Sequence, residues 1–294
     1  MTTATLDPML LDDFDGNGRV DLLAPASGVW FVLKWTGSAF SWSSTGTTVD
    51  SGATSFNFAS ADVNGDGLPD LVSLRGNGVL YSGLNTAVGG AVSFAAATPG
   101  GAIGFTPGVV TFIRGNNSIA SSPVSHMDFD GDGRDDIYVE SNTGTIVSGQ
   151  HVTVQYLSRG SSFVAGNFIV NPGWGGFSWP VAWNDDGCTD LISNDVLRIS
   201  GCSTAAAATL TVGFAVLVTD WDEDGRTDIL GASGGVLQLY RSTGSGVAAP
   251  VSTGLAAGTG SWLVLDQNGD GLEDLAFVPN TAGAPLTYGL HNGA

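Results

Sequence analysis

Basic residues are scarce in this sequence of 294 residues. Lysine and arginine together number 9, against 28 aspartates and glutamates, which gives a formal net charge of −19. A nucleic-acid partner is excluded, because phosphate binding requires a basic stripe that a few scattered cations cannot form. The same acidic excess argues against attraction to an anionic membrane surface.

Long hydrophobic runs are also missing, although 43% of the residues are hydrophobic and the mean hydropathy is +0.19. No stretch approaches the roughly 18 apolar residues of a transmembrane helix. The first ten residues, MTTATLDPML, lack the basic and apolar regions of a secretion signal. We therefore expect no membrane insertion, and either a cytosolic chain or a segment of a longer protein.

Signals for helices are equally few. The longest alanine run, at residues 205–208, is short, whereas 44 glycines are spread along the chain with short apolar runs between them. This composition is typical of many short strands joined by tight turns. The sequence therefore predicts an all-β fold.

An acidic nonapeptide of the form D-x-[DN]-x-[DN]-G-x-x-D recurs along the chain. The copies, named loop 1 to loop 6, lie at residues 13–21, 62–70, 128–136, 182–190, 220–228 and 266–274. Each copy is followed at once by a short apolar run, such as Leu22–Leu23 or Ile229–Leu230. The repeating unit is therefore a strand, an acidic loop and a second strand.

Two further strands usually follow each loop, as at Val29–Trp35 and Phe40–Ser43 after loop 1 and at Val236–Tyr240 after loop 5. Four short strands in about 45 to 50 residues is the period of a propeller blade. We expect residues 1–294 to form a single β-propeller domain of four-stranded blades, with the acidic loop between the first and second strands of each blade. Six blades agree with 294/6 = 49 residues per repeat, and seven, with help from outside this segment, is the alternative.

The ends of the repeat array are less regular. The last repeat stops soon after Leu286–Leu290, so either Ala4–Leu6 completes the last blade or the protein continues past Ala294. Loops 2 and 3 start 66 residues apart, which predicts an insertion at about residues 95–107.

The acidic loops have the composition of cation sites. Positions 1, 3 and 5 place short oxygen side chains inside one tight turn, glycine at position 6 adopts a conformation that a Cβ would resist, and aspartate at position 9 closes the ring. With a backbone carbonyl near position 7, this gives six or seven oxygen ligands, which suits Ca²⁺ better than Mg²⁺. The alternative is a set of solvated turns, since aspartate and glycine are common in turns.

Five loops carry a complete set of predicted calcium ligands. These ligands are Asp13, Asp15, Asn17 and Asp21; Asp62, Asn64, Asp66 and Asp70; Asp128, Asp130, Asp132 and Asp136; Asp220, Asp222, Asp224 and Asp228; and Asp266, Asn268, Asp270 and Asp274. In loop 4, Ala182 replaces the first ligand, so we expect weak or no calcium at Asn184, Asp186 and Asp190. The ligand positions hold 19 of the 28 acids, whose mutual repulsion within single turns favours bound cations.

These nonapeptides, each followed by leucine or isoleucine, resemble the FG-GAP and VCBS repeat family over nearly the whole chain. The resemblance implies a calcium-bearing β-propeller, in which calcium is structural and not catalytic. Segments 28–33, 79–85 and 288–293 look most like the propeller region of bacterial RHS/SpvB-type toxin proteins. That finer resemblance implies a fragment of a larger secreted protein, located outside the cell or at its surface.

Cysteine and histidine are rare. Cys188 and Cys202 bracket a predicted hairpin, and we expect them to form a disulfide, with two buried free thiols as the alternative. His126, His151 and His291 are scattered without the spacing of a metal site or a catalytic motif. We therefore expect no enzymatic activity.

Aromatic residues occupy position 2 of four loops, as Phe14, Phe129, Trp183 and Trp221, which predicts packing between blades. The segment from Trp174 to Pro180, which includes Trp179, is rich in glycine and aromatic residues, as in a loop on which a sugar ring stacks; core packing is the alternative. The expected function is a structural scaffold or protein-interaction module, bound to a protein partner or to the rest of a longer polypeptide. The alternative is a lectin that binds glycans between blades or at the Trp174–Trp179 loop.

Overall fold

The computed structural model describes residues 9–36, 38–104, 111–115, 126–141, 151–171, 178–193, 196–199, 201–202, 208–211, 217–265, 272–281, 285–289 and 291. Over these ranges the chain forms strands and turns and contains no helix, which confirms the all-β class. The same ranges accordingly hold no helix long and apolar enough to cross a membrane.

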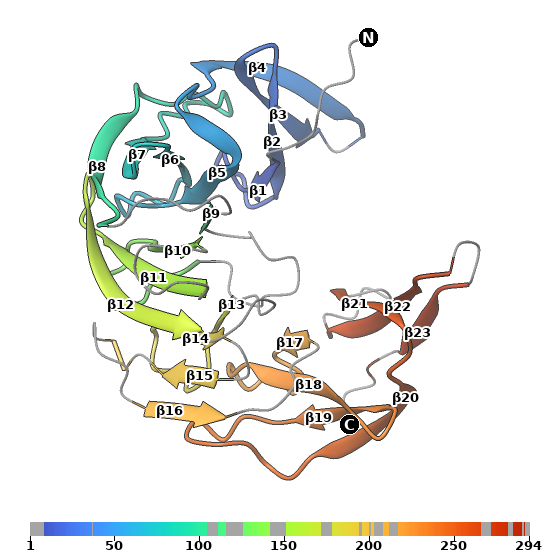
Figure 1. The fold of residues 1–294 in the computed structure, drawn as a ribbon. Coiled ribbons are helices and arrows are strands. Elements are labelled where there is room, and N and C mark those ends of the chain that lie inside the picture. Colours follow the sequence, from blue (N-terminus) through green and yellow to red (C-terminus); the bar gives the residue numbers. More distant parts are fainter. Residues whose placement is uncertain are drawn as a thin grey trace. The chain divides into compact units, whose positions relative to one another are not determined.

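The described strands form antiparallel sheets in which neighbours along the chain pair with one another (Figure 1). Three sheets belong to a first compact unit, before residue 175. Sheet 1 contains β1 (Leu10–Asp12), β2 (Asp21–Ala26), β3 (Val29–Trp35) and β4 (Phe40–Thr48). Sheet 2 contains β5 (Ala53–Ala61), β6 (Asp70–Arg75), β7 (Val79–Gly83) and β8 (Thr98–Ala102), and sheet 3 contains β9 (Thr111–Arg114), β10 (Ile137–Ser141), β11 (His151–Ser158) and β12 (Phe163–Asn171).

Three more sheets belong to a second compact unit, after residue 176. Sheet 4 contains β13 (Ser178–Val181), β14 (Asp190–Ser193), β15 (Val196–Ile199) and β16 (Ala208–Thr211). Sheet 5 contains β17 (Leu217–Thr219), β18 (Asp228–Ser233), β19 (Val236–Tyr240) and β20 (Val251–Ala256). Sheet 6 contains β21 (Gly260–Leu265), β22 (Asp274–Pro279) and β23 (Thr287–Gly289).

Each acidic loop lies between the first and second strands of its sheet, as expected. The strands predicted at Val29–Trp35 and Val236–Tyr240 are β3 and β19, and the one predicted at Phe40–Ser43 continues to Thr48. The single closed ring stays a prediction, and the segment Ala4–Leu6 lies outside the described residues.

The position expected for the insertion, residues 95–107, is wrong at Thr98–Ala102, which forms β8, the fourth strand of sheet 2, and residues 105–107 lie outside the described residues. The sequence Pro99-Gly100-Gly101 is typical of a turn, but here it pairs with β7. Glycine is required at this point because a Cβ on Gly100 would lie 2.9 Å from the ring of Phe163 in β12. Close approach of a neighbouring sheet therefore explains the glycines.

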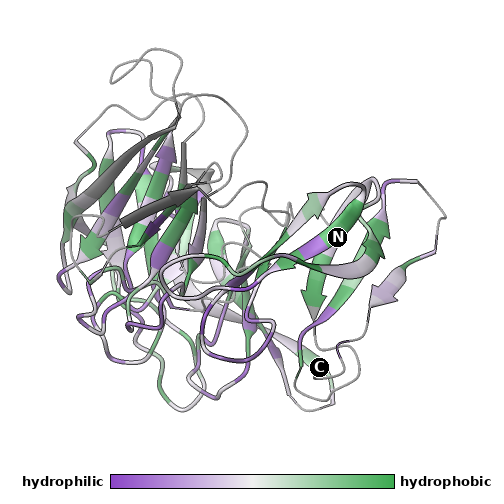
Figure 2. Cartoon of the chain, turned by 90° about the horizontal axis from the view of Figure 1, so that it is seen from below, coloured by the Kyte–Doolittle hydropathy of each residue, from purple (hydrophilic) through white to green (hydrophobic). Residues whose placement is uncertain are grey.

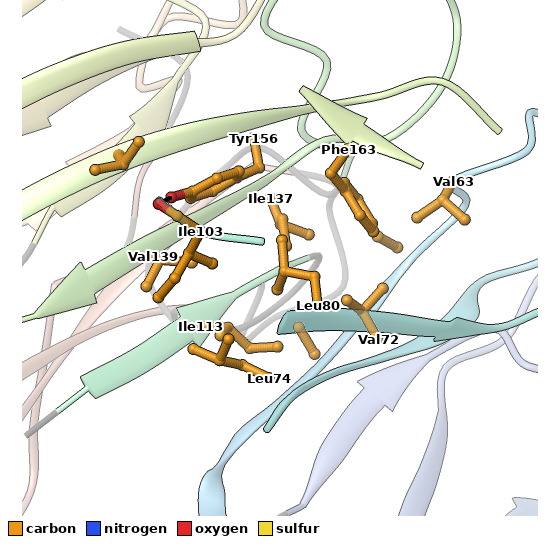
Figure 3. Packing of buried hydrophobic residues seen from close by; sticks show 13 residues of the cluster. Val63, Val72, Leu74, Leu80, Ile103, Ile113, Ile137, Val139, Tyr156 and Phe163 are labelled. Atoms are coloured by element: carbon orange, nitrogen blue, oxygen red, sulfur yellow. Dashed lines mark hydrogen bonds between the residues drawn. The ribbon is translucent and has the colours of Figure 1, made fainter. Parts of the chain in front are cut away.

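Hydrophobic side chains of neighbouring sheets meet in shared cores. Figure 3 shows the cluster between sheets 2 and 3, where Leu74, Leu80, Ile137 and Val139 are fully buried. Comparable clusters join sheet 1 to sheet 2, sheet 4 to sheet 5, and sheet 5 to sheet 6. Figure 2 shows the hydrophobic residues concentrated in the strands, with many hydrophilic residues in the loops. Each fully buried leucine or isoleucine contributes about 1.5 to 3 kcal/mol, so these clusters hold neighbouring sheets together.

The aromatic residues at position 2 of the loops are part of this packing. Phe14 and Trp183 are fully buried in clusters shared with the following sheet, and Phe129 is 1% exposed. Trp221 is half-buried against the cluster between sheets 5 and 6. The predicted packing role of these residues is confirmed for the clusters that Phe14, Trp183 and Trp221 join.

Cys188 and Cys202 form the expected disulfide, with 5.3 Å between their Cα atoms. The bond joins position 7 of loop 4 to a residue that follows β15, and it spans 14 residues. Loop 4 is the copy that lacks the aspartate of position 1, so the covalent link stands where the acidic loop is least complete.

We predict that the double variant Cys188→Ala/Cys202→Ala loses about 3 kcal/mol of unfolding free energy. A cross-link over a loop of this length lowers the conformational entropy of the unfolded chain and so raises its free energy by about that amount. Guanidinium denaturation measures the change. Wild-type protein treated with dithiothreitol is the control and should be destabilised equally. Equal stability of the variant and the oxidised wild type would contradict a structural role for the disulfide.

Candidate metal centres in the acidic loops

Aspartate at position 1 organises the backbone of the acidic loops. In loop 2, the Asp62 carboxylate accepts hydrogen bonds from the three backbone N–H groups of residues 65–67, at 2.8, 3.1 and 2.7 Å. Asp128 accepts the equivalent three bonds in loop 3, and Asp13 and Asp220 accept two each. The first predicted calcium ligand therefore also holds the turn together.

The loop backbone has positive φ at two positions. Position 6 has it as expected, with values from 79° at Gly133 to 86° at Gly67. Position 4 also has it, with 75° at Gly65 and 55° at Glu223. The second position was not predicted from the sequence, because loops 4 and 5 carry residues other than glycine there.

Aspartate at position 9 is buried in every loop. The exposed fractions are 2% for Asp21, 0% for Asp70, 0% for Asp136, 0% for Asp190, 1% for Asp228 and 0% for Asp274. A buried carboxylate is stable only when hydrogen bonds or cations compensate the loss of water. The partners of this residue are therefore central to the fold of each sheet.

Backbone N–H groups from two places converge on the position-9 carboxylate. One oxygen of Asp136 accepts a bond of 2.8 Å from Phe129 at position 2 of the loop, and the other accepts one of 2.7 Å from Ser158 at the end of the third strand. The bond from the end of the third strand recurs at Asp228 and Asp274, at 2.7 Å in both. The carboxylate thus ties the acidic loop to the third strand, a role that was not predicted from the sequence.

The residue that makes this third-strand bond also reaches the preceding sheet. Its side chain donates a hydrogen bond to the backbone carbonyl at position 2 of the preceding loop. The pairs are Asn85 to Phe14 at 2.9 Å, Ser158 to Val63 at 2.6 Å, and Ser242 to Trp183 at 2.8 Å. One short segment therefore fixes the acidic loop within a sheet and that sheet against its neighbour.

Three loops bring carboxylate oxygens close enough to share a cation. In each, one oxygen per residue lies within 4.8 Å of the others, and the groups are Asp13–Asp15–Asp21, Asp128–Asp130–Asp136 and Asp220–Asp222–Asp224. Within the described part of the chain, the buried oxygens Asp15 Oδ1, Asp21 Oδ2 and Asp130 Oδ1 accept no hydrogen bond. Buried oxygens of this kind require a donor or a cation. The donor set and these spare oxygens fit a hard divalent ion.

Burial and neighbouring acids raise the pKa of the position-9 carboxyls. Burial is the larger cause, and the other loop carboxylates add to it, so the pKa rises to about 7 for Asp21, about 7 for Asp70, about 8 for Asp136 and about 6 for Asp228. A raised pKa means that the charged form is disfavoured at these positions unless positive charge is supplied. This electrostatic demand is what a bound cation satisfies.

Basic side chains lie beside the carboxylates of the same three loops. The pairs are Lys34–Asp15 at 2.9 Å, Arg159–Asp130 at 2.7 Å, Arg159–Asp132 at 2.9 Å and Arg241–Asp222 at 3.5 Å. Each basic residue comes from the third strand or follows it directly, 19 or more residues along the chain. That distance explains why no signal in the sequence pointed to these pairs.

Loops 2 and 4 differ from these three. Among the described residues, the loop 2 acids do not form a group within 4.8 Å, and the Asn64 amide donates to Asp66 at 2.9 Å. In loop 4, where Ala182 supplies no carboxylate, the Asn184 amide makes the same bond to Asp186 at 2.8 Å. In loop 6, Asp266, Asn268 and Asp270 lie outside the described residues, and Asp274 is buried.

The remaining candidates from the sequence are not members of the three carboxylate groups. Trp174 lies outside the described residues, and Trp179 packs half-buried against the core of sheets 4 and 5. His126 lies 3.2 Å from Asp135, and the His291 ring stacks on Trp221 with 4.3 Å between centroids. His151 belongs to β11, and its side chain is not described.

We predict that Asp128→Ala destabilises the calcium-free protein by about 1 to 2 kcal/mol, because three loop N–H groups lose their acceptor. The matched control is Asp130→Ala, which removes mainly a partly exposed ion pair and should cost less than about 1 kcal/mol. Urea denaturation in the presence of a chelator measures both. Equal losses for the two variants would contradict the separate roles of positions 1 and 3.

The FG-GAP-like repeat family matches this chain over residues 13–73 and 220–277. The first segment contains loops 1 and 2, and the second contains loops 5 and 6. No curated protein matches the sequence.

Solved structures are similar to this chain at low sequence identity. An Agrocybe aegerita lectin, described as recognising non-reducing terminal N-acetylglucosamine, has a TM-score of 0.60 at 18% identity over 84% of this chain and 66% of that chain. A chain of the Photorhabdus luminescens Tc holotoxin pore has a TM-score of 0.49 at 20% identity over 97% of this chain and 14% of that chain. The chain thus spans slightly under two thirds of the lectin chain and a small part of the toxin chain. With its acidic loops set between paired strands, the chain carries FG-GAP-like repeats, as its resemblance to the FG-GAP and VCBS family predicted.

Proposed function

We propose that this chain is a calcium-binding β-propeller that acts as a non-enzymatic scaffold or protein-interaction module. The observation that carries the proposal is the grouping of three carboxylates within 4.8 Å in loops 1, 3 and 5, with buried oxygens that have no hydrogen-bond donor among the described residues. FG-GAP-like repeats over loops 1, 2, 5 and 6 support the same assignment.

Calcium would be held by the ligands predicted from the sequence in loops 1, 2, 3, 5 and 6. When bound, it supplies two positive charges to buried carboxylates and accepts the six or seven oxygen ligands that such a loop offers. The position-9 aspartates then remain charged and keep their hydrogen bonds to the third strand. The aspartate at position 1 fixes the turn, and the residue at the end of the third strand links neighbouring sheets.

Six blades are the proposed arrangement of the ring. Sheets 1 to 5 each hold four described strands with the same antiparallel order, and sheet 6 holds three. Each sheet carries one acidic loop at the same place, which is what a repeat of one blade requires. A seventh blade from outside this segment is the alternative.

An exposed row of apolar residues on one face of sheet 1 supports the proposal of a protein partner. Paired residues across the four strands form an apolar row, Leu11, Leu22, Leu33 and Trp42. Leu11 is 38% exposed and Trp42 is 52% exposed, and the neighbouring Trp35 and Phe40 are 41% and 67% exposed. An apolar patch of this kind marks a protein-interaction surface, which fits either a separate partner or further parts of a longer polypeptide.

An extracellular or cell-surface location is part of the proposal, as is membership of a larger secreted bacterial protein of the RHS type. The disulfide between Cys188 and Cys202 supports an oxidising compartment. Calcium is abundant outside cells, where loops of modest affinity are filled.

We predict that the melting temperature falls by about 5 °C or more when EDTA removes calcium, because binding to the folded state alone stabilises it by about 2.7 kcal/mol per site at a hundredfold excess over Kd. Differential scanning calorimetry with calcium, with magnesium and with EDTA measures this. The matched control is the triple variant Asp15→Ala/Asp130→Ala/Asp222→Ala, which should lose most of the calcium-dependent gain. If EDTA leaves the melting temperature of the wild type unchanged, calcium has no structural role.

Glycan binding is the second candidate function. It is favoured by two cavities between adjacent sheets that combine an arginine, hydroxyl groups and aromatic rings, and by the fold shared with a lectin. An array of immobilised oligosaccharides tests it on the whole chain. Reproducible binding that a soluble sugar competes away would support a lectin, and an array without signal would oppose it.

A further inference from the structure

The outer strands of sheets 1 and 5 contain the same β-bulge. In β4 the pairing with β3 shifts between Val29 and Phe31, and in β20 the pairing with β19 shifts between Val236 and Gln238. Both bulges have the sequence Ser-Thr-Gly, at residues 44–46 and 252–254. The glycine has nearly the same positive φ in the two, 72° at Gly46 and 73° at Gly254.

Hydrogen bonds within the two bulges are also equivalent. Each threonine hydroxyl donates to a carbonyl of the third strand at 2.9 Å, from Thr45 to Trp30 and from Thr253 to Leu237. The same hydroxyl accepts the backbone N–H two residues later, at 3.1 Å in β4 and 3.2 Å in β20. These two hydrogen bonds fix the threonine side chain. They also hold the backbone of the outer strand in the bulge, where it does not pair regularly with the third strand.

Each bulge lines a cavity against the following sheet. The cavity beside Thr45 has a volume of 570 Å³, and the one beside Thr253 has a volume of 310 Å³. The opposite wall is also equivalent, since it contains a cross-strand leucine–glycine pair, Leu71–Gly83 in sheet 2 and Leu275–Gly289 in sheet 6.

Glycine at this wall position is what leaves the space open. In sheet 3 the equivalent partner of Ile137 is Tyr156, which is 1% exposed. Its hydroxyl donates a hydrogen bond of 2.5 Å to the carbonyl of Ile103, beside the outer strand of sheet 2. Between sheets 2 and 3 a tyrosine thus occupies the wall position that glycine holds at both cavities.

The two cavities have similar chemistry. The larger contains the Arg75–Asp50 ion pair, at 2.8 Å, together with Ser73 and the rings of Phe58 and Phe94. The smaller contains Arg241, Ser252 and the Trp221 ring, whereas Asp222, which lies 3.5 Å from Arg241, is outside its lining. Arginine offers N–H donors in both cavities, Asp50 adds a carboxylate acceptor in the larger, and the rings offer an apolar wall.

We propose that these two cavities are equivalent binding sites for a neutral polyhydroxylated ring of monosaccharide size. Hydroxyl groups of such a ring both donate and accept hydrogen bonds, which matches the arginine and hydroxyl side chains that line both cavities, and its C–H face packs on the aromatic wall. Cavities of about 300 to 1,000 Å³ are the usual size for small ligands. The proposal rests on the second candidate function and places it at the Ser-Thr-Gly bulges, not at the Trp174–Trp179 loop.

The test fills each cavity from an exposed position on its rim. Ala96→Phe blocks the larger and Ser252→Phe blocks the smaller, while Ala91→Phe and Ser245→Phe place the same ring on exposed positions outside the linings. Thermal melting first confirms that all four variants fold. Calorimetry then uses the mono- or disaccharide that the wild type binds most strongly on the oligosaccharide array.

The expected result is two sugar sites per chain in the wild type and in both controls, and one site in each cavity variant. The double variant Ala96→Phe/Ser252→Phe should bind the sugar at least tenfold more weakly than the wild type. Sugar binding that persists unchanged in the double variant would overturn the proposed sites while leaving the lectin candidate standing. An array on which the wild type binds no sugar would overturn both and leave the calcium-dependent scaffold unaffected.

Discussion

A buried carboxylate at the ninth position of each acidic loop is the constraint on which the rest of this structure depends. Asp70, Asp136 and Asp274 are fully buried, yet each must accept backbone N–H groups to join its loop to the third strand. If the position-9 aspartate were protonated, its carboxyl group could accept fewer hydrogen bonds than the ionised form. If it were ionised without a neighbouring positive charge, its burial would cost too much free energy. The loop therefore needs positive charge beside it.

Two sources of positive charge are available to the loops, and they have different consequences. Lys34, Arg159 and Arg241 reach loops 1, 3 and 5 from the third strand and compensate part of their charge, but they lie at partly exposed positions. A divalent cation in the loop is nearer the buried oxygens and contacts several carboxylates at once. Calcium would thus complete an electrostatic arrangement that the basic side chains only begin. Asn85, Ser158 and Ser242 lie at or just after the end of the third strand, and each bonds a carbonyl of the preceding sheet. A change in the charge of the acidic loop is therefore transmitted to the contact between sheets.

Much of this organisation could be predicted from the sequence because the repeat is short and its spacing is regular. The nonapeptides indicated the strand–loop–strand unit, and the aromatic residues at position 2 indicated the inter-sheet packing seen for Phe14 and Trp183. Contacts between residues distant in the chain could not be predicted, as for Lys34 with Asp15 or Tyr156 with Ile103. The strand β8 was not predicted for the same reason, since Phe163, which packs against its glycines, lies far along the chain.

The central claim, that calcium compensates the buried acids, is tested most directly by counting bound ions. Purified protein is saturated with calcium, passed through a desalting column in a buffer whose only added metal is calcium at a low known concentration, and analysed by mass spectrometry of the metal content. The account predicts about five calcium ions per chain, one for each loop with a complete ligand set. A chain that folds to the same secondary structure and retains no calcium would contradict it.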